Sequence, residues 1–561
     1  MEKKVFARCL DCAHQDTIDF NQPACSACGS LWREAIYDYP YIRASLLSSL
    51  PSRPFNLWRY SELLPTDPPP FSFQMGEGGT PLIHAASLGS MLGMKHIYIK
   101  DERQNPTSSF KDRQAAVAIH AFKQSKVNEL VCASTGNVAI SYSAYAARAG
   151  IRLWAFLTSL VPPEKMREVA SYGTRVIKVT GTYDQTKQLA AQFALERHIA
   201  LDLGSKSIAC IEAMKTLAFE ICEQLALSSL PSFSTMPSLS TPWRAPDWYF
   251  QSVSGGMGPL GVIKGFRELF AMSLIQAIPK MGIVQVAGCA PMVHAWHDKK
   301  ANAIPVTSPQ TMIATLATGD PGRTYTELLS QMNGASGGSF CSVTDEEAYR
   351  AMHLLAKMEG ISVEPAAAVA FAGLFHEVRA GTVKPDDLVV VNCTGHTLPI
   401  ENHILDTATE QQVEAGVSFS DFGYEEGLLA ALNNLNTIRY PRIAIVDDAP
   451  NVRRLISRIL KSQGNYVLFE AVDGNSAIDL VSREKPDLVI LDLMMPDVDG
   501  FSVIDQIHAQ RETRDIPIIV MTAKDLTIQE KIRLQGQIQS LMRKGNFVSE
   551  KLLSEVKALI K

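Results

Sequence analysis

The composition lacks any strong bias, and what is missing narrows the class of protein. The 53 Lys and Arg residues nearly balance the 58 Asp and Glu residues, and the formal net charge is -5. Without a cationic excess, no nucleic-acid partner is expected. No apolar run reaches the ~20 residues that a membrane-spanning helix needs, and the first residues carry no signal-peptide core. We therefore expect a cytoplasmic protein with no membrane partner, whose thiols stay reduced.

The length and the local patterns indicate several domains. At 561 residues the chain is longer than a typical single domain. Strand-like apolar runs alternate with helix-like segments over residues 39–410 and again over residues 441–561, which predicts α/β folds with parallel sheets. Residues 1–38 are predicted to form a short cysteine-paired module, and residues 411–440 a linker.

Four of the ten cysteines cluster near the N-terminus. They form two Cys-x-x-Cys pairs, Cys9 with Cys12 and Cys25 with Cys28, separated by twelve residues. Two such pairs can present four thiolates to one tetrahedral ion, so a zinc ribbon with a structural Zn²⁺ site is predicted; the alternatives are a chance pattern or a redox pair. The metal would supply folding energy that so short a module cannot obtain from its own core.

Residues 39–410 contain a series of short motifs. Asn105–Arg113 reads NPTSSFKDR, and Ala133–Asn137 reads ASTGN. Further motifs stand at Gly76–Leu82, Glu212–Glu220, Gly288–Pro291, Gly360–Ala366 and Cys393–His396. In this order, the motifs resemble those of the threonine synthase family. The resemblance implies a lyase-like enzyme that uses pyridoxal phosphate (PLP). It also implies PLP fold-type II, a tryptophan synthase beta-like α/β core of two subdomains.

The resemblance also implies roles for individual residues. Lys111 would bind PLP as a Schiff base and later move protons, a task that burial favours by lowering the pKa of the amine. Asn137 would hydrogen-bond the 3′-hydroxyl of PLP, and Thr394 would face the pyridine nitrogen. The loop that binds the substrate carboxylate through backbone amides would comprise Ser134, Thr135 and Gly136. The segment that cradles the PLP phosphate would comprise Ser254, Gly255, Gly256, Met257 and Gly258.

One position departs from the family pattern. Cys210 stands where threonine synthases carry an arginine that grips the phosphate of O-phosphohomoserine. A thiol cannot make that forked, charge-assisted contact, and losing it costs on the order of a hundredfold in affinity. The expected reaction converts O-phosphohomoserine and water to threonine and phosphate. Two alternatives remain open: the same fold acting on a different amino acid, by β-replacement or dehydration, or a non-catalytic sensor of PLP or an amino acid.

Residues 441–561 resemble a response-regulator receiver domain, which implies a flavodoxin-like (βα)5 fold. Three apolar runs end in Asp447-Asp448, Asp492 and Thr522, and Lys544 follows them. Because strand ends meet at one edge of a parallel sheet, the three carboxylates are predicted to bind Mg²⁺. Asp492 would accept a phosphoryl group, which Thr522 and Lys544 would contact.

The two resemblances together imply the partners. We expect an amino-acid substrate, a homodimer, and a cognate histidine kinase or phosphotransfer protein of a two-component system. The covalent fusion motivates the hypothesis that phosphorylation at Asp492 tunes the PLP domain or its oligomeric state.

Overall fold

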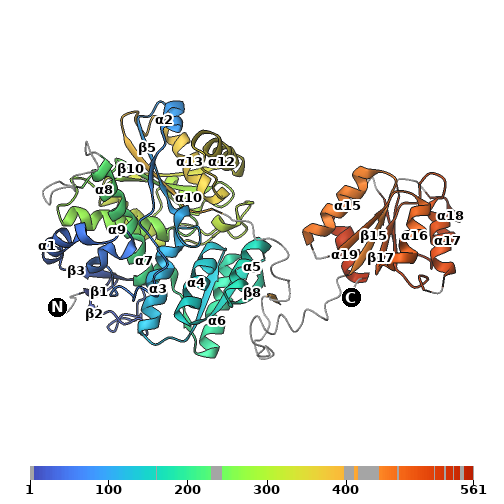
Figure 1. Ribbon diagram of the computed structural model, residues 1–561, viewed down its shortest axis with the longest axis horizontal. Helices are drawn as coiled ribbons and strands as arrows, with labels where there is room; N and C mark the ends of the chain where they lie inside the picture. Colours follow the sequence, from blue (N-terminus) through green and yellow to red (C-terminus); the bar gives the residue numbers. More distant parts are fainter. Residues whose placement is uncertain are drawn as a thin grey trace. The chain divides into compact units, whose positions relative to one another are not determined.

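The chain divides into two compact units, Met1–Leu432 and Asn433–Lys561 (Figure 1). The computed structural model describes residues 5–159, 161–228, 243–396, 410–414, 441–463, 466–510, 512–522, 526–534, 536–543 and 549–559. No helix among these residues is long and apolar enough to cross a membrane.

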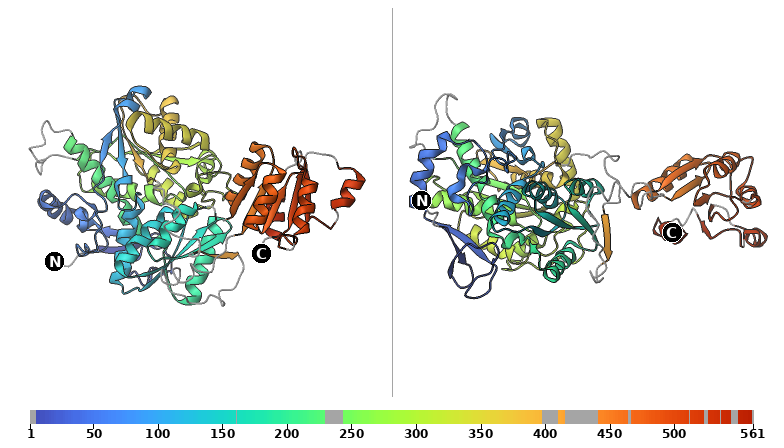
Figure 2. Two further views of the ribbon diagram at one scale, coloured as in Figure 1. Left: turned by 45° about the vertical axis from the view of Figure 1, so that its right-hand side comes forward. Right: turned by 60° about the horizontal axis from the view of Figure 1, so that its bottom comes forward.

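The N-terminal module of the first unit is a small antiparallel sheet. Its strands follow the order β2-β1-β3, with bounds β1 (Val5–Cys9), β2 (Gln15–Thr17) and β3 (Arg33–Tyr37). Side chains alternate between the two faces of a strand, and β3 thereby turns Ala35 and Tyr37 into the hydrophobic core of the first unit. The module therefore packs against the rest of that unit (Figure 2).

The larger sheet of the first unit has six strands and is parallel except for β4. In spatial order the strands are β12 (Gly338–Val343), β11 (Lys280–Val286), β10 (Trp248–Ser252), β13 (Leu388–Cys393), β5 (His96–Asp101) and β4 (Leu82–His84). Along β10, Trp248 and Phe250 enter one core cluster while Tyr249 enters another. Both faces are thus covered, which explains why the central strands read as continuous apolar runs.

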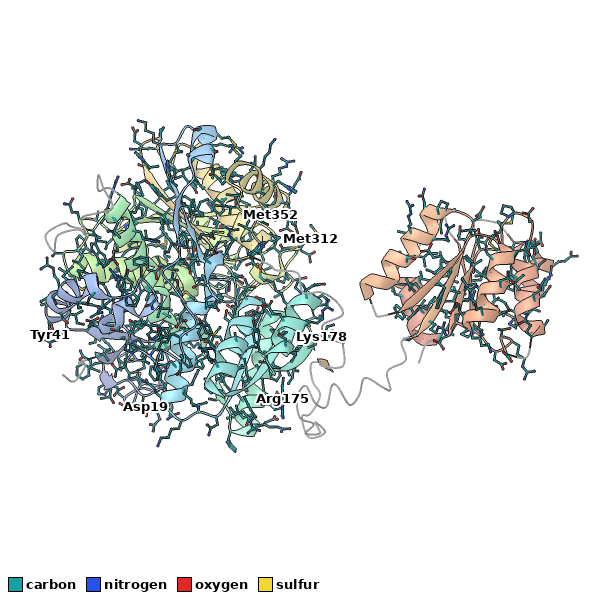
Figure 3. The ribbon with its side chains drawn as sticks, in the orientation of Figure 1. Asp19, Tyr41, Arg175, Lys178, Met312 and Met352 are labelled. Atoms are coloured by element: carbon teal, nitrogen blue, oxygen red, sulfur yellow. The ribbon has the colours of Figure 1, made fainter. Side chains whose placement is uncertain are left out.

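The second sheet of this unit is entirely parallel. In spatial order its strands are β14 (Glu410–Glu414), β8 (Arg175–Thr180), β7 (Arg152–Thr158), β6 (Glu129–Ser134) and β9 (Ala200–Leu201). Strand β14 lies at the start of the segment predicted as a linker, yet its backbone pairs along all of β14 with β8. Arg175 and Lys178 of β8 are labelled in Figure 3.

Helices cover both sheets of the first unit. The helices are α1 (Tyr39–Ser49), α2 (Ala86–Leu92), α3 (Lys111–Gln124), α4 (Asn137–Ala149), α5 (Pro163–Ser171), α6 (Tyr183–Arg197), α7 (Ile208–Met214), α8 (Thr216–Ser228), α9 (Met257–Ala271), α10 (Pro291–His297), α11 (Arg323–Asn333), α12 (Asp345–Glu359) and α13 (Pro365–Arg379). Capping boxes start two of them, Thr182 with Gln185 at α6 and Thr344 with Glu347 at α12. Helices α3 and α4 cover one face of the second sheet and α6 the other.

The second unit is a five-stranded parallel sheet between helices. Its strands follow the order β16-β15-β17-β18-β19, with bounds β15 (Arg442–Val446), β16 (Val467–Ala471), β17 (Leu488–Leu491), β18 (Ile518–Thr522) and β19 (Ser540–Arg543). Its helices are α15 (Pro450–Gln463), α16 (Gly474–Glu484), α17 (Gly500–Ala509), α18 (Ile528–Leu534) and α19 (Ser549–Leu559). This order is that of flavodoxin-like folds, so the fold class predicted for this part is confirmed.

Candidate active site

Lys111 is the first residue of α3 and lines a cavity of about 560 Å³. Burial lowers the pKa of its amine from 10.5 to about 8, because the surrounding protein solvates an ammonium ion poorly. Its Nζ atom lies 4.4 Å from the centre of the Phe110 ring. The amine therefore has a far larger unprotonated fraction near neutral pH than a free lysine has, which suits both nucleophilic attack and proton transfer.

The residues around Lys111 hold its helix in place. Asp112 is buried and accepts hydrogen bonds from the Thr107 backbone N–H (2.7 Å) and the Thr107 hydroxyl (2.6 Å). Burial raises the pKa of the Asp112 carboxyl to about 7. Arg113, also buried, donates two hydrogen bonds to Glu102 (2.7 Å each) and two to Glu220 (2.7 and 2.8 Å). The motif around the lysine therefore fixes the start of α3 through its own polar side chains.

The ASTGN loop joins β6 to α4 at the wall of the same cavity, which Thr135 and Asn137 line. The Ser134 hydroxyl oxygen is buried and accepts hydrogen bonds from the N–H groups of Gly136 (2.9 Å) and Ala139 (3.1 Å). Gly136 adopts a φ of +137°, a conformation that other residues rarely take. The loop is thus shaped by its own serine and glycine, and it presents Thr135 and Asn137 to the cavity.

Two charged residues that the sequence did not single out contact Asn137. Lys165 of α5 donates from Nζ to Asn137 Oδ1 (2.6 Å) and to Glu364 Oε2 (2.8 Å), and Asn137 Nδ2 donates to Glu364 Oε1 (2.7 Å). Lys165 and Glu364 are both buried. Glu364 lies in the GISVEPA motif, which gave a signal for its presence but not for this contact, and Lys165 belonged to no motif. The cluster orients the Asn137 amide at the cavity wall.

The glycine-rich segment follows β10 and leads into α9, and all of Ser254 to Gly258 line the cavity. Gly256 has a φ of +82°, and a Cβ atom there would lie 2.8 Å from Met292 Cε. A Cβ atom on Gly258 would lie 2.4 Å from Gln251 Nε2. Since a helix N-terminus and bare glycine amides favour anions, this arrangement fits a phosphate group.

Of the remaining predicted residues, Thr394 lines the cavity and Cys210 does not. Thr394 follows β13, lines the cavity, and accepts a hydrogen bond at its carbonyl from the Phe110 N–H (2.9 Å). Cys210 is 0% exposed and contacts the Tyr142 hydroxyl (3.4 Å) and Asp202 Oδ1 (3.7 Å). Burial raises the pKa of the Cys210 thiol, so the thiol is uncharged and does not attract an anion.

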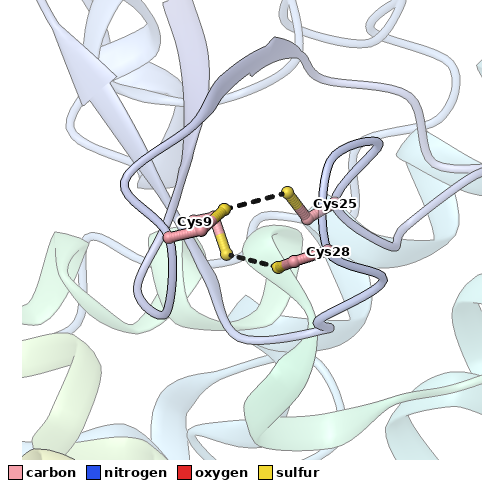
Figure 4. A group of neighbouring side chains, drawn as sticks. Cys9, Cys25 and Cys28 are labelled. Carbon is pink, nitrogen blue, oxygen red and sulfur yellow. Dashed lines mark hydrogen bonds between the residues drawn. The ribbon is translucent and has the colours of Figure 1, made fainter.

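The four N-terminal cysteines converge on one point (Figure 4). The sulfur atoms of Cys9 and Cys28 lie 3.6 Å apart, and those of Cys12 and Cys25 lie 3.7 Å apart. A tetrahedral zinc ion with Zn–S bonds of about 2.3 Å needs sulfur atoms about 3.8 Å apart. The arrangement therefore fits a structural Zn²⁺ ion held by four thiolates.

An acidic group forms at the strand ends of the second unit. The carboxylate oxygens of Asp447, Asp448 and Asp492 lie within 4.8 Å of one another, with Asp447 and Asp492 buried and Asp448 exposed. Thr522 is buried at the end of the neighbouring strand β18. Three carboxylate oxygens at this spacing fit a hard divalent cation such as Mg²⁺. The predicted Lys544 lies outside the described residues.

The cavity and the acidic strand edge define two known classes of domain. Residues 73–395 match the family model of the pyridoxal-phosphate dependent enzymes, and residues 443–556 match the response regulator receiver domain. The first match covers more than half of the chain, and the chain belongs to the PLP-dependent enzyme family. The family implies PLP as the cofactor, and the amine of Lys111 and the glycine cradle, where an added Cβ would collide, fit this group.

Threonine synthases are similar to this chain over most of their own length. That of Methanocaldococcus jannaschii is 35% identical over 393 residues, which cover 70% of this chain and 92% of the relative. That of Methanosarcina acetivorans is 32% identical over 407 residues, with 72% and 95% covered. Diaminopropionate ammonia lyase from Escherichia coli shares the fold, at 16% identity and a TM-score of 0.50, over 71% of this chain and 94% of that chain. The protein is thus a threonine synthase-like PLP enzyme with a C-terminal receiver domain.

Proposed function

We propose that the first unit converts O-phosphohomoserine and water to threonine and inorganic phosphate. The observation that carries the proposal is the gathering of Lys111, Asn137, Thr394 and the glycine-rich segment around one cavity, in a chain 35% identical to a threonine synthase. When bound, PLP supplies an electron sink for a carbanion formed on an amino acid. A lyase of this type breaks a carbon–oxygen bond, and phosphate is a good leaving group.

The protein's own residues divide the work. Lys111, whose amine has a pKa of about 8, takes a proton from the substrate and returns one to the product. The Asn137 amide, which Lys165 and Glu364 orient, would hydrogen-bond the 3′-oxygen of the cofactor. Thr394, which lines the cavity, would offer a hydroxyl to the pyridine nitrogen. A hydroxyl cannot force a proton onto that nitrogen as a carboxylate would, and this choice of residue would favour elimination and replacement.

The amides of residues 134–136 and the glycine cradle hold the two anionic ends of the reactants. The Gly136 N–H already donates to Ser134, so within this loop the amide of Thr135 is the stronger candidate for the substrate carboxylate. Ser254, Gly255, Gly256, Met257 and Gly258 would hold the cofactor phosphate at the N-terminus of α9.

The experiment is a coupled measurement of both products. Purified PLP-loaded protein is incubated with O-phosphohomoserine, and threonine and phosphate are quantified together. Equal amounts of the two support the proposal, and a Lys111→Ala variant is the control, because it keeps the cavity and lacks the amine. Absence of both products from a protein that retains bound PLP would contradict it.

A second candidate is the same chemistry on a different amino acid, by β-replacement or dehydration. The observation that favours it is Cys210, which is neutral, buried and engaged with Tyr142 and Asp202 where threonine synthases carry a phosphate-binding arginine. Incubation with a panel of β- and γ-substituted amino acids separates the two candidates: ammonia and 2-oxo acids report dehydration, and a new amino acid formed with an added nucleophile reports β-replacement.

For the second unit we propose phosphorylation at Asp492 by a histidine kinase or phosphotransfer protein. Receiver domains in general take part in phosphotransfer, and the three carboxylates fit the Mg²⁺ ion that this reaction requires. Phosphorylation would then tune the first unit or its assembly into a homodimer. Turnover and molecular mass measured with and without acetyl phosphate test this link, and identical values would contradict it.

A further inference from the structure

The N-terminal ribbon reaches the cavity that contains Lys111. Trp32, the residue before β3, lines that cavity together with Arg323 at the start of α11. The Arg323 guanidinium carbon lies 5.2 Å from the centre of the Trp32 ring, a distance typical of cation–π contacts. Asp11, which stands between Cys9 and Cys12, accepts a hydrogen bond from Arg323 Nη1. A residue inside the cysteine cluster thus binds a residue of the cavity wall.

A second set of contacts seats the ribbon on α7 and on α9, the helix that begins at the glycine cradle. The hydroxyl of Tyr37, at the end of β3, donates to Glu212 Oε2 (2.8 Å) in the interior. The Nζ atoms of Lys215 and of Lys264 in α9 lie 4.0 and 5.4 Å from the centre of the Tyr37 ring. Since all of these polar groups are buried and paired, the ribbon has a fixed position on the first unit.

Arg323 is held but keeps capacity for a ligand. Its Nε donates to Glu327 (2.6 Å) and its Nη1 to Asp11, whereas Nη2 has no protein acceptor among the described residues. Thr324, the next residue, donates its hydroxyl hydrogen to Ser205 Oγ (2.9 Å), which brings Lys206 to the same side of the cavity. Lys206 is exposed and has no ion-pair partner within the described ranges.

We propose that the ribbon completes the substrate pocket. Asp11 and Trp32 are positioning residues that fix Arg323, and Arg323 with Lys206 binds the anionic leaving group of the substrate in place of the arginine that Cys210 replaces. The anionic character of that group rests on the proposed function, whereas the ribbon contact does not. A planar guanidinium with a free Nη2 provides two N–H donors that match phosphate oxygens. Its two carboxylate partners, Asp11 and Glu327, fix the direction of the guanidinium, and this alignment is what Asp11 contributes to phosphate binding.

The test uses inorganic phosphate as the probe, titrated by calorimetry into the full-length PLP-loaded protein with zinc bound. Arg323→Met and Asp11→Asn should each weaken phosphate binding about tenfold, which corresponds to about 1.4 kcal/mol. Asp11→Glu, which keeps a carboxylate, should retain most of the wild-type affinity for phosphate. Zinc content and the absorbance of the lysine-bound cofactor should stay at wild-type values, because neither the thiolates nor the cofactor contacts change.

Two matched controls separate this role from a loss of charge alone. Glu34→Gln removes another ribbon carboxylate, which pairs with Arg8 on the surface. Arg350→Met removes an exposed arginine that pairs with Glu346 at the same spacing as Arg323 with Glu327. Both variants should bind phosphate as the wild type does.

A double variant tests whether Asp11 acts through Arg323. Asp11→Asn combined with Arg323→Met should bind phosphate no more weakly than Arg323→Met alone. Wild-type affinity in Arg323→Met, or full additivity in the double variant, would overturn the inference. Phosphate binding that depends on Asp11 and Arg323 in a protein that makes no threonine would uphold the inference and refute the proposed function. If the wild type turns over O-phosphohomoserine, Arg323→Met and Asp11→Asn should each raise KM about tenfold and leave kcat nearly unchanged.

Discussion

Replacing Arg113 by Met should destabilise the first unit strongly while leaving the second unit intact. The Arg113 guanidinium is fully buried and makes four hydrogen bonds to the carboxylates of Glu102 and Glu220, plus one each to the hydroxyls of Thr216 (3.0 Å) and Thr80 (3.3 Å). Lys100, likewise buried, donates to Glu220 Oε2 (2.7 Å). The cluster thus balances two cations against two carboxylates, and the substitution leaves two carboxylates with one cation.

The magnitude follows from the geometry. Two unit charges about 4 Å apart attract by about 4 kcal/mol at an effective dielectric constant of about 20. Desolvation of the ions offsets much of this attraction in the intact cluster, but breaking a buried pair by removing one partner costs about 3–5 kcal/mol. We expect a loss in this range, which is a large part of the roughly 5–15 kcal/mol by which a typical domain is stable. Arg113→Lys keeps the charge but lacks the forked donors, so its free energy of unfolding should lie between those of Arg113→Met and the wild type.

The assay can isolate the first unit because all six tryptophans lie in it. Urea unfolding followed by tryptophan fluorescence therefore reports that unit alone. The pKa of Glu220 is lowered to about 2, since Arg113 and Lys100 outweigh the opposing effect of burial. A carboxyl group whose pKa is lowered by folding stabilises the folded state at pH values above its unfolded pKa of about 4.5. This stabilisation is lost as the pH falls toward 2. The difference in the free energy of unfolding between wild type and Arg113→Met should therefore shrink as the pH falls from about 4.5 to about 2. A loss below about 1 kcal/mol at pH 7 would refute the reasoning.

Three further predictions address the two sites. The rate at which the cofactor-free protein captures PLP should rise with pH with a midpoint near 8, because the Lys111 amine loses its proton there. A midpoint near the 10.5 of free lysine, found by stopped-flow absorbance, would contradict this. Gly256→Ala should weaken PLP binding about tenfold in equilibrium dialysis, since the residue sits at a φ of +82° and the new Cβ would meet Met292. Gly173→Ala, at a φ of +78° in open space, is the matched control and should bind PLP normally. Asp492→Asn should abolish Mg²⁺-dependent labelling by acetyl phosphate in a gel-shift assay for phosphorylated protein, and retained labelling would assign the phosphoryl group to another residue.

The fold class was predictable because local patterns and family motifs pointed to the same architecture. Apolar runs of four to seven residues became the buried strands of parallel sheets, and the order of motifs matched a PLP enzyme followed by a receiver domain. The prediction of a threonine synthase-like PLP enzyme with a receiver domain is confirmed at the level of family. The residues proposed for PLP, Lys111, Asn137 and Thr394 among them, come to one cavity because each lies at the end of a strand or the start of a helix.

Contacts between segments far apart in the chain could not be predicted from the sequence. Lys165 meets Glu364 across 199 residues, and Arg323 meets Asp11 across 312 residues. Neither pair has a spacing rule, since only the folded backbone brings the two charges together, and a single Lys or Arg on a helix is usually a solvated surface residue. The contact of the ribbon with the cavity through Trp32 was likewise undetermined, because a lone aromatic after a cysteine pair has no local signature.

Strand β14 decides where the enzyme can be separated from its receiver. A chain cut before Glu410 would lose the strand that pairs with β8 and would expose an edge, RVIKVT, that contains two valines and an isoleucine. Open edges of this kind recruit other chains, so such a fragment should aggregate. The natural edge is instead a five-residue strand with a glutamate at each end, EQQVE, a poor template for further pairing. The stretch that joins the two units in sequence therefore also protects the sheet of the first unit from edge-to-edge pairing with other chains.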